Sequence, residues 1–219
     1  TIKARMYVIY LLAYNTGMRE GEIAGLTWDC LNVDKKEISV HQQVIRADGK
    51  YQIVSPKTEA SYREVTISDK LISLLLELQE NYRKLGYSTD FIFGSLFKKD
   101  TPTPPANIAR VFKQCLKGAG IKRHITFHDL RHTHVTSLLE ADISVNTVAE
   151  RIGHAYTKQQ AEEMIRHANW LLDQKRGTPE YEQRVVRAQK AEEKEMNATG
   201  VGIIAGVIFF IICIIMALS

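Results

Sequence analysis

Two arginines in this chain have the residue type and the sequence surroundings needed to hold a phosphodiester. Arg19 lies in a Thr-Gly-Met-Arg-Glu-Gly-Glu segment, and Arg131 lies in a His-Asp-Leu-Arg-His segment. A guanidinium is planar, permanently charged and bidentate, so it matches two oxygens of a phosphate. When a phosphodiester breaks without a metal, negative charge builds up on its two non-bridging oxygens. We therefore expect Arg19 and Arg131 to stabilise these oxygens.

Three further residues have the chemistry to move protons around such a phosphate. His128 and His154 can accept or position protons, because imidazole titrates near neutral pH. Lys57 lies in a Pro-Lys-Thr-Glu-Ala-Ser turn between two predicted strands, where its amine can protonate a leaving 5′-oxygen. A metal-binding interpretation is open for His128 and His132, which are four residues apart on one predicted helix face. No third ligand follows at a familiar spacing, so we expect no metal ion.

Hydrophobic periodicity predicts that helices dominate the part of the chain that contains these residues. The expected helices span residues 4–14, 21–28, 69–85, 106–117, 127–140 and 145–152. Gly17 is expected to end the first helix and Asp69 to cap the third. The last two helices and the tight turn between them also match a helix-turn-helix that reads DNA.

Strand-like segments lie between the second and third predicted helices. They are residues 37–45, 51–54 and 63–67, separated by turns at Asp48-Gly49 and at residues 57–61. The sequence therefore predicts an α+β fold that is mainly helical and contains a small three-stranded antiparallel sheet.

The distribution of charge is more informative than its total. The net charge is +4, and the whole excess lies before Tyr156. A surplus this small does not establish a polyanionic partner, because binding depends on where the charges cluster. Such runs are most often solvated helix faces, but one is a candidate DNA contact: Arg110, Lys113, Lys117, Lys122 and Arg123. The three cysteines are too far apart for a C-x-x-C site, and they fit a reducing, cytoplasmic setting.

Taken in order, these segments resemble the catalytic domain of the tyrosine recombinases, and within them the integrases of phages and conjugative transposons. The resemblance covers about residues 4–155 and rests on Thr16–Trp28, the turn lysine, the His-x-x-Arg box and Gly153-His154. It implies five assisting catalytic residues: Arg19, Lys57, His128, Arg131 and His154. Glu22, three residues after the first arginine, matches an acidic residue that supports that arginine.

The resemblance also implies an activity, namely site-specific cleavage and rejoining of double-stranded DNA. Such enzymes attack a DNA strand with a tyrosine, which gives a 3′-phosphotyrosyl link and a free 5′-hydroxyl. The link stores the energy of the broken bond, so no cofactor or metal is needed. Four protomers normally assemble on two duplexes.

The nucleophilic tyrosine is not where the resemblance places it. In the family it follows the Gly-His pair by about nine residues, where this chain has Ala161-Glu-Glu-Met164. Three interpretations are open. Integrase sequence ends near Ala155 and is joined to an unrelated segment, a deletion has displaced the nucleophile to Tyr156, or Tyr181 reaches the site from this protomer or another. We favour the first, in which cleavage is impaired.

The chain is predicted to have three parts. Residues 1–155 form the catalytic domain, without the core-binding domain that family members carry before it, and residues 156–199 form charged amphipathic helices. Gly200–Ser219 contains no charged side chain. Twenty helical residues at about 1.5 Å each span roughly 30 Å, the thickness of a bilayer's hydrocarbon core. The basic residues before this segment favour a single-pass membrane anchor with the catalytic part on the cytoplasmic side.

Two functions from different classes follow from these observations. The first is a tyrosine-type integrase whose cleavage is impaired. The alternative is a non-catalytic, membrane-tethered DNA-binding protein that keeps the phosphate-binding residues without the chemistry.

Overall fold

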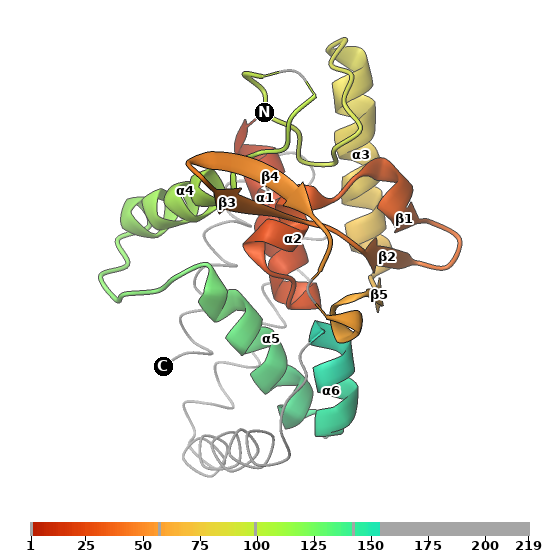
Figure 1. Ribbon diagram of the computed structural model, residues 1–219. Helices are drawn as coiled ribbons and strands as arrows, with labels where there is room; N and C mark the ends of the chain where they lie inside the picture. The colour runs from red at the N-terminus through yellow and green to blue at the C-terminus, as the bar shows by residue number, and fades with distance from the viewer. Residues whose placement is uncertain (1, 57, 99, 142, 154–219) are drawn as a thin grey trace.

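The computed structural model describes residues 2–56, 58–98, 100–141 and 143–153 of the chain (Figure 1). Within them the helices are α1 (Ile2–Thr16), α2 (Glu20–Gly25), α3 (Asp69–Lys84), α4 (Pro105–Gly118), α5 (His128–Glu140) and α6 (Val145–Ile152). The strands are β1 (Leu31–Asn32), β2 (Glu37–Val40), β3 (Gln43–Ala47), β4 (Lys50–Val54) and β5 (Arg63–Thr66). Short 3-10 turns lie at Trp28–Cys30 and Glu59–Ser61.

Helix α1 is the element around which the main hydrophobic core is built. Ile9 and Leu12 are completely buried, and α3, α4 and α5 all pack against α1. The ring of Tyr10 meets Phe112 of α4 and Phe127 edge to face, with centroid distances of 5.1 and 6.1 Å. Phe127 directly precedes α5, so these ring contacts fix the start of the helix that carries the His-x-x-Arg box.

The strands form two separate antiparallel units. In the first, with the order β1-β2-β5, buried Ile38 pairs with buried Val65. In the second, β3 and β4 form a hairpin whose turn residues Asp48 and Gly49 both have positive φ angles. Figure 1 shows this hairpin lying across α2. A Cβ atom on Gly21 of α2 would lie only 2.7 Å from the Val44 carbonyl oxygen, so glycine is what permits this close approach.

The predicted fold class is confirmed, but the composition of the sheet is not the one expected. The predicted strand at 37–45 is divided between β2 and β3, which belong to different sheets. Gln42 lies at the division, and its side-chain amide donates a hydrogen bond of 2.6 Å to the Gly25 carbonyl oxygen. This bond draws the chain out of the first sheet towards α2. The third strand of the sheet is β1, and the predicted strand at 51–54 pairs with β3 instead.

The predicted helices are present, with small differences at their ends. Gly17 follows the end of α1 with a φ of +65°, as a helix-ending glycine should. The prediction that Asp69 caps α3 is wrong by one residue. The Ser68 hydroxyl accepts a hydrogen bond from the Leu71 backbone nitrogen, and Asp69 is the first helical residue.

Several predictions lie outside the described residues. They are the domain boundary after residue 155, the amphipathic helices of 156–199 and the membrane anchor at Gly200–Ser219. None of the helices described between residues 2 and 153 has both the length and the apolar character of a membrane span.

Candidate active site

A cleft of about 490 Å³ lies where α2, α4 and α5 begin and the β3–β4 hairpin passes over them. The lining includes three arginines, one carboxylate and one histidine: Arg19, Arg46, Arg131, Glu20 and His128. The other lining residues are Met18, Gly21, Gln43, Val44, Ile45, Tyr51, Pro105, Ala106 and Phe127. Three arginines against one carboxylate give the cleft an excess of positive charge, and burial raises the pKa of that carboxylate, Glu20.

Arg19 precedes α2, and Glu22 in the first turn of the helix holds it at two points. The Arg19 backbone nitrogen donates to Glu22 Oε2 at 2.8 Å, which satisfies a backbone donor at the start of the helix. Its side-chain Nη1 donates to Glu22 Oε1 at 2.9 Å. The Arg19 side chain is 34% exposed and lines the cleft. Glu22 therefore holds both the backbone and the side chain of Arg19 in place.

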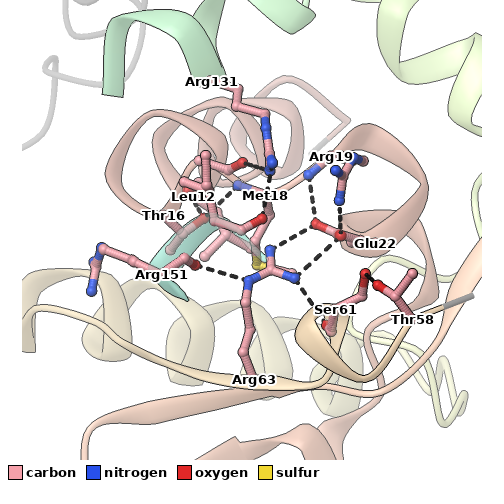
Figure 2. A network of polar contacts seen from close by, with 12 residues as sticks. Leu12, Thr16, Met18, Arg19, Glu22, Thr58, Ser61, Arg63, Arg131 and Arg151 are labelled. Atoms are coloured by element: carbon pink, nitrogen blue, oxygen red, sulfur yellow. Dashed lines mark hydrogen bonds and ion pairs between the residues drawn. The ribbon is translucent and has the colours of Figure 1, made fainter. Parts of the chain in front are cut away.

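Arg63 is a second partner of Glu22 that the sequence did not indicate. Figure 2 shows its guanidinium lying between Glu22, Ser61 and Arg151. Nη2 donates to Glu22 Oε2 at 2.9 Å and Nη1 to Oε1 at 3.2 Å. Nη1 also donates to the Ser61 carbonyl oxygen, and Nε donates to the Arg151 carbonyl oxygen at 2.8 Å. Only 5% of the Arg63 side chain is exposed, so this is a buried bidentate ion pair.

Two effects of opposite sign act on the Glu22 carboxyl group. Burial, the larger single effect, would raise its pKa. The hydrogen bonds and charge of Arg63, together with those of Arg19, outweigh burial, and the pKa is lowered. Glu22 is thus a carboxylate at neutral pH although it is 3% exposed.

Two backbone carbonyl groups hold the Arg131 side chain. Nη1 donates to the Gly17 carbonyl oxygen at 2.6 Å, and Nη2 donates to the Ile152 carbonyl oxygen at 2.9 Å. The first contact ties α5 to the turn before Arg19, and the second ties α5 to the end of α6. Arg131 is 5% exposed and reaches the cleft, so its guanidinium is fixed before any ligand arrives.

A buried histidine of α5 and a partly buried arginine of α6 join these two helices. Arg151 Nε donates to His134 Nε2 at 3.2 Å, and its Nη2 donates to the carbonyl oxygens of Asn15 and Thr66. Burial, and then the charge of Arg151, lower the pKa of His134 to about 4. His134 is therefore neutral at physiological pH and acts as an acceptor towards Arg151.

His128 lies at the start of α5, exposed on the rim of the cleft. Partial desolvation, then the neighbouring His132 and Arg131, lower its pKa, so the ring is a neutral proton acceptor at neutral pH. The His128 and His132 rings meet edge to face at 4.8 Å. Among the residues that the structure describes, no group of three His, Cys, Asp or Glu side chains is placed to hold a metal ion.

The structure thus brings together three of the five assisting residues predicted from the sequence: Arg19, His128 and Arg131. Lys57 and His154, and the nucleophile candidates Tyr156 and Tyr181, lie outside the described residues. None of the five residues of the basic cluster lines the cleft. Arg110, Lys113 and Lys117 are exposed on α4, and Lys122 and Arg123 are exposed in the segment that follows.

Several solved recombinase structures share this fold. The crystal structure of XerA recombinase superposes with a TM-score of 0.60, at 24% identity over 80% of this chain and 58% of that one. The Tn1549 transposon integrase in complex with circular intermediate DNA gives a TM-score of 0.58, at 21% identity over 73% of this chain and 58% of that one. At these identities the likeness establishes the fold.

The sequence comparisons establish the family. Residues 1–160 match the model of the phage integrase family, and the chain belongs to that family. It is 32% identical to a XerC-like tyrosine recombinase of Caldanaerobacter subterraneus subsp. tengcongensis over 69% of this chain and 43% of the relative. It is 36% identical to the ICEBs1 integrase of Bacillus subtilis over 68% of this chain and 41% of the relative. The chain therefore spans about two fifths of the length of these curated relatives.

Proposed function

We propose that this chain is the catalytic part of a tyrosine-type site-specific recombinase that acts on double-stranded DNA. The observation that carries the proposal is the convergence of Arg19, Arg131 and His128 on one cleft. Two of these side chains are permanently charged, and both are held in place by other groups of the protein. A preorganised pair of guanidiniums suits a group that gains negative charge during reaction.

The proposed reaction exchanges one phosphodiester for another. A tyrosine oxygen attacks the phosphorus, the bond to the 5′-oxygen breaks, and a 3′-phosphotyrosyl link forms. Arg19 and Arg131 stabilise the non-bridging oxygens, while neutral His128, with His154, accepts or positions the tyrosine proton. Lys57 donates a proton to the 5′-oxygen. Attack of a 5′-hydroxyl from a second strand reverses these steps and rejoins the DNA, so no cofactor or metal enters the scheme.

Cleavage by this particular chain is proposed to be impaired. Tyr156 follows His154 by two residues and Tyr181 follows it by twenty-seven, whereas the nucleophile is expected about nine residues after it. A displaced nucleophile loses the alignment on which attack at phosphorus depends. The exposed arginines and lysines of the basic cluster on and after α4 are proposed as further phosphate contacts, and assembly of four protomers on two duplexes follows by family.

The alternative function uses the same cleft without chemistry. In it the chain is a DNA-binding protein, tethered to a membrane through Gly200–Ser219, that keeps the two arginines as phosphate contacts. The tyrosine spacing favours this alternative, because binding needs the cations and not the nucleophile.

A nicked suicide duplex separates the two functions. The complete chain is incubated with a pool of nicked duplexes whose core sequence is randomised, and covalent protein–DNA adducts are isolated under denaturing conditions. An adduct mapped to Tyr156 or Tyr181 establishes the enzyme. In that case Arg19→Ala should slow adduct formation by about 10²-fold or more. Reversible, salt-sensitive binding without any adduct supports the non-catalytic alternative instead.

A further inference from the structure

The buried guanidinium of Arg63 binds three segments of the chain that lie far apart in sequence. It holds both carboxylate oxygens of Glu22 in α2, the Ser61 carbonyl oxygen in the 3-10 turn before β5, and the Arg151 carbonyl oxygen in α6 (Figure 2). One planar group thereby donates four N–H···O hydrogen bonds. A lysine ammonium has three donors in a tetrahedral arrangement and cannot reproduce this fork.

The segments bound by Arg63 are the ones from which proposed site residues extend. Glu22 supports Arg19 directly. Ser61 closes the segment that contains Lys57, and Arg151 precedes Gly153-His154 by two residues. Arg63 itself is absent from the cleft lining. Its contribution to the site must therefore pass through the groups that it holds.

The path from Arg63 to Arg19 consists of one carboxylate. Glu22 Oε2 accepts from Arg63 Nη2 and from the Arg19 backbone nitrogen, and Oε1 accepts from Nη1 of both arginines. Without Arg63, the carboxylate would be free to turn about its side-chain bonds, and Arg19 would follow it. With Arg63 in place, both oxygens have fixed directions, and Oε1 holds the guanidinium of Arg19 at the lining of the cleft.

We propose that Arg63 is a positioning residue that sets Arg19 for contact with a DNA phosphate by fixing both oxygens of Glu22. The inference rests on the proposed function, because a phosphate in the cleft is part of it. It predicts that Arg63 contributes to phosphate binding only when Arg19 is present.

Paired substitutions test this dependence with no need for cleavage. Arg63→Lys keeps the charge but loses the fork, and binding of a fluorescent duplex of mixed sequence is measured by anisotropy with the complete chain. The variant should bind the duplex about tenfold more weakly than the parent, because the loss of one charge-assisted phosphate contact weakens binding by about that factor. In an Arg19→Ala background, Arg63→Lys should cause no further loss. Glu22→Gln should behave in the same way, because it changes the other partner of the Arg63–Glu22 ion pair.

A matched control comes from an exposed Arg–Glu pair elsewhere on the chain. Arg83 binds Glu80 on α3 with Nε and Nη2, both at 2.7 Å. Arg83→Lys should leave DNA affinity unchanged in both backgrounds. Thermal unfolding of every variant ensures that binding is compared between folded proteins. The proposal is overturned if Arg63→Lys weakens binding equally with and without Arg19, or if it has no effect while the parent binds.

A second readout needs no DNA and separates this inference from the proposed function. The side-chain Nε–H signal of Arg19 is followed by ¹H–¹⁵N NMR. Arg63→Lys should shift and broaden that signal, because the carboxylate that holds Arg19 is released, and Arg83→Lys should leave it in place. If the parent binds no DNA, the proposed function fails. An Arg19 signal that is unchanged by Arg63→Lys overturns the positioning role in either case.

Discussion

The ends of helices α1 and α3 share two features, a glycine with a positive φ angle and a nearby glutamate–arginine ion pair, but their surroundings differ. Gly17 after α1 and Gly86 after α3 both have a φ of +65°. Near each end a glutamate binds an arginine through two nitrogen–oxygen contacts, Glu22 with Arg63 and Glu80 with Arg83. In the first pair the side chains are 4% and 5% exposed, and in the second they are 42% and 74% exposed.

The difference shows that burial and connection give a polar contact its importance here. The exposed pair joins residues three apart on one helix, and water can replace either partner. The buried pair joins α2 to β5, and the same arginine continues to α6. Removing one partner of a buried pair leaves an uncompensated charge away from water. The site end of α1 should therefore respond strongly to substitutions that the α3 end tolerates.

The largest expected effect comes from neutralising the buried carboxylate. Glu22→Gln keeps the size of the side chain but leaves Arg63 buried without its anion, which should lower the free energy of unfolding by about 4 kcal/mol. Urea titration of the two variants measures the difference. Glu80→Gln, the matched change at the exposed pair, should leave the transition midpoint where it is. Equal losses in the two variants would show that burial is not what separates the pairs.

The second largest expected effect is a loss of stability in acid caused by His134, which packs next to Gly17 at the end of α1. Its pKa is about 4 in the folded chain and 6.5 in an unfolded one, so between these values the unfolded state binds more protons. The contribution is complete above pH 6.5 and is lost as the pH falls towards 4, by about 3 kcal/mol in total. Urea titrations at a series of pH values should give this slope.

A substitution assigns that slope to one residue. His134→Gln keeps an acceptor for Arg151 but does not titrate, so most of the slope between pH 6.5 and 5 should disappear. The lowered pKa of His128 contributes the slope that remains. The lowered pKa of Glu22 makes its own contribution only at lower pH, because an unfolded glutamate titrates near 4.5. His132→Gln is the control at an exposed position of the same helix and should preserve the slope. A slope that is as steep after His134→Gln as before it would assign the pH dependence to another group.

Sequence analysis could find the site residues whose motif partners lie only a few positions away in the chain. Arg19 and Glu22 are three residues apart, as are His128 and Arg131. Arg63 was missed because its partners are far away, with Glu22 41 positions and Arg151 88 positions distant in sequence. One signal was present. Arg63 shares a strand face with the buried Val65, so its charge lies on the inward side of β5.

The fold could be predicted from the sequence to about the same extent as the site. Local rules placed the helix ends to within a residue or a few. Gly17 ends α1 as predicted, whereas the cap of α3 is Ser68, one residue before the predicted Asp69. Strand pairing could not be predicted from local rules. The division of residues 37–45 depends on the hydrogen bond from Gln42 to the Gly25 carbonyl oxygen, which is a contact between two elements. Period-two alternation gives no information about which sheet a strand joins.

The third prediction compares the two left-handed glycines. Alanine at a φ of +65° costs about 1 kcal/mol in either place. At Gly86 nothing lies within 4 Å of an added Cβ atom. At Gly17 the added atom would lie 2.8 Å from the His134 ring and 3.0 Å from Ile152 Cγ2. Gly17→Ala should therefore cost about 2 kcal/mol, with overpacking added to backbone strain.

Differential scanning calorimetry of the two alanine variants makes this comparison directly. Because Arg131 donates to the Gly17 carbonyl oxygen, Gly17→Ala should also weaken DNA binding if the proposed function is correct. Gly86→Ala should leave DNA binding unchanged. Identical losses of stability in the two variants would mean that the packing beneath the cleft relaxes without cost.

The smallest expected effect is at the exposed pair itself, and it tests the comparison from the other side. Arg83→Met removes both contacts to Glu80 but leaves a carboxylate that water can solvate and that Lys84 also approaches, at 3.7 Å. The midpoint of urea unfolding should not change, at low or high salt, because an exposed pair on one helix contributes little. A measurable loss at low salt that disappears at high salt would show that the α3 end is held by charge after all. The exposed and the buried ion pair would then differ only in how much each contributes to stability. The positioning of Arg19 would in that case depend more on the direction of the Arg63 contacts than on their burial.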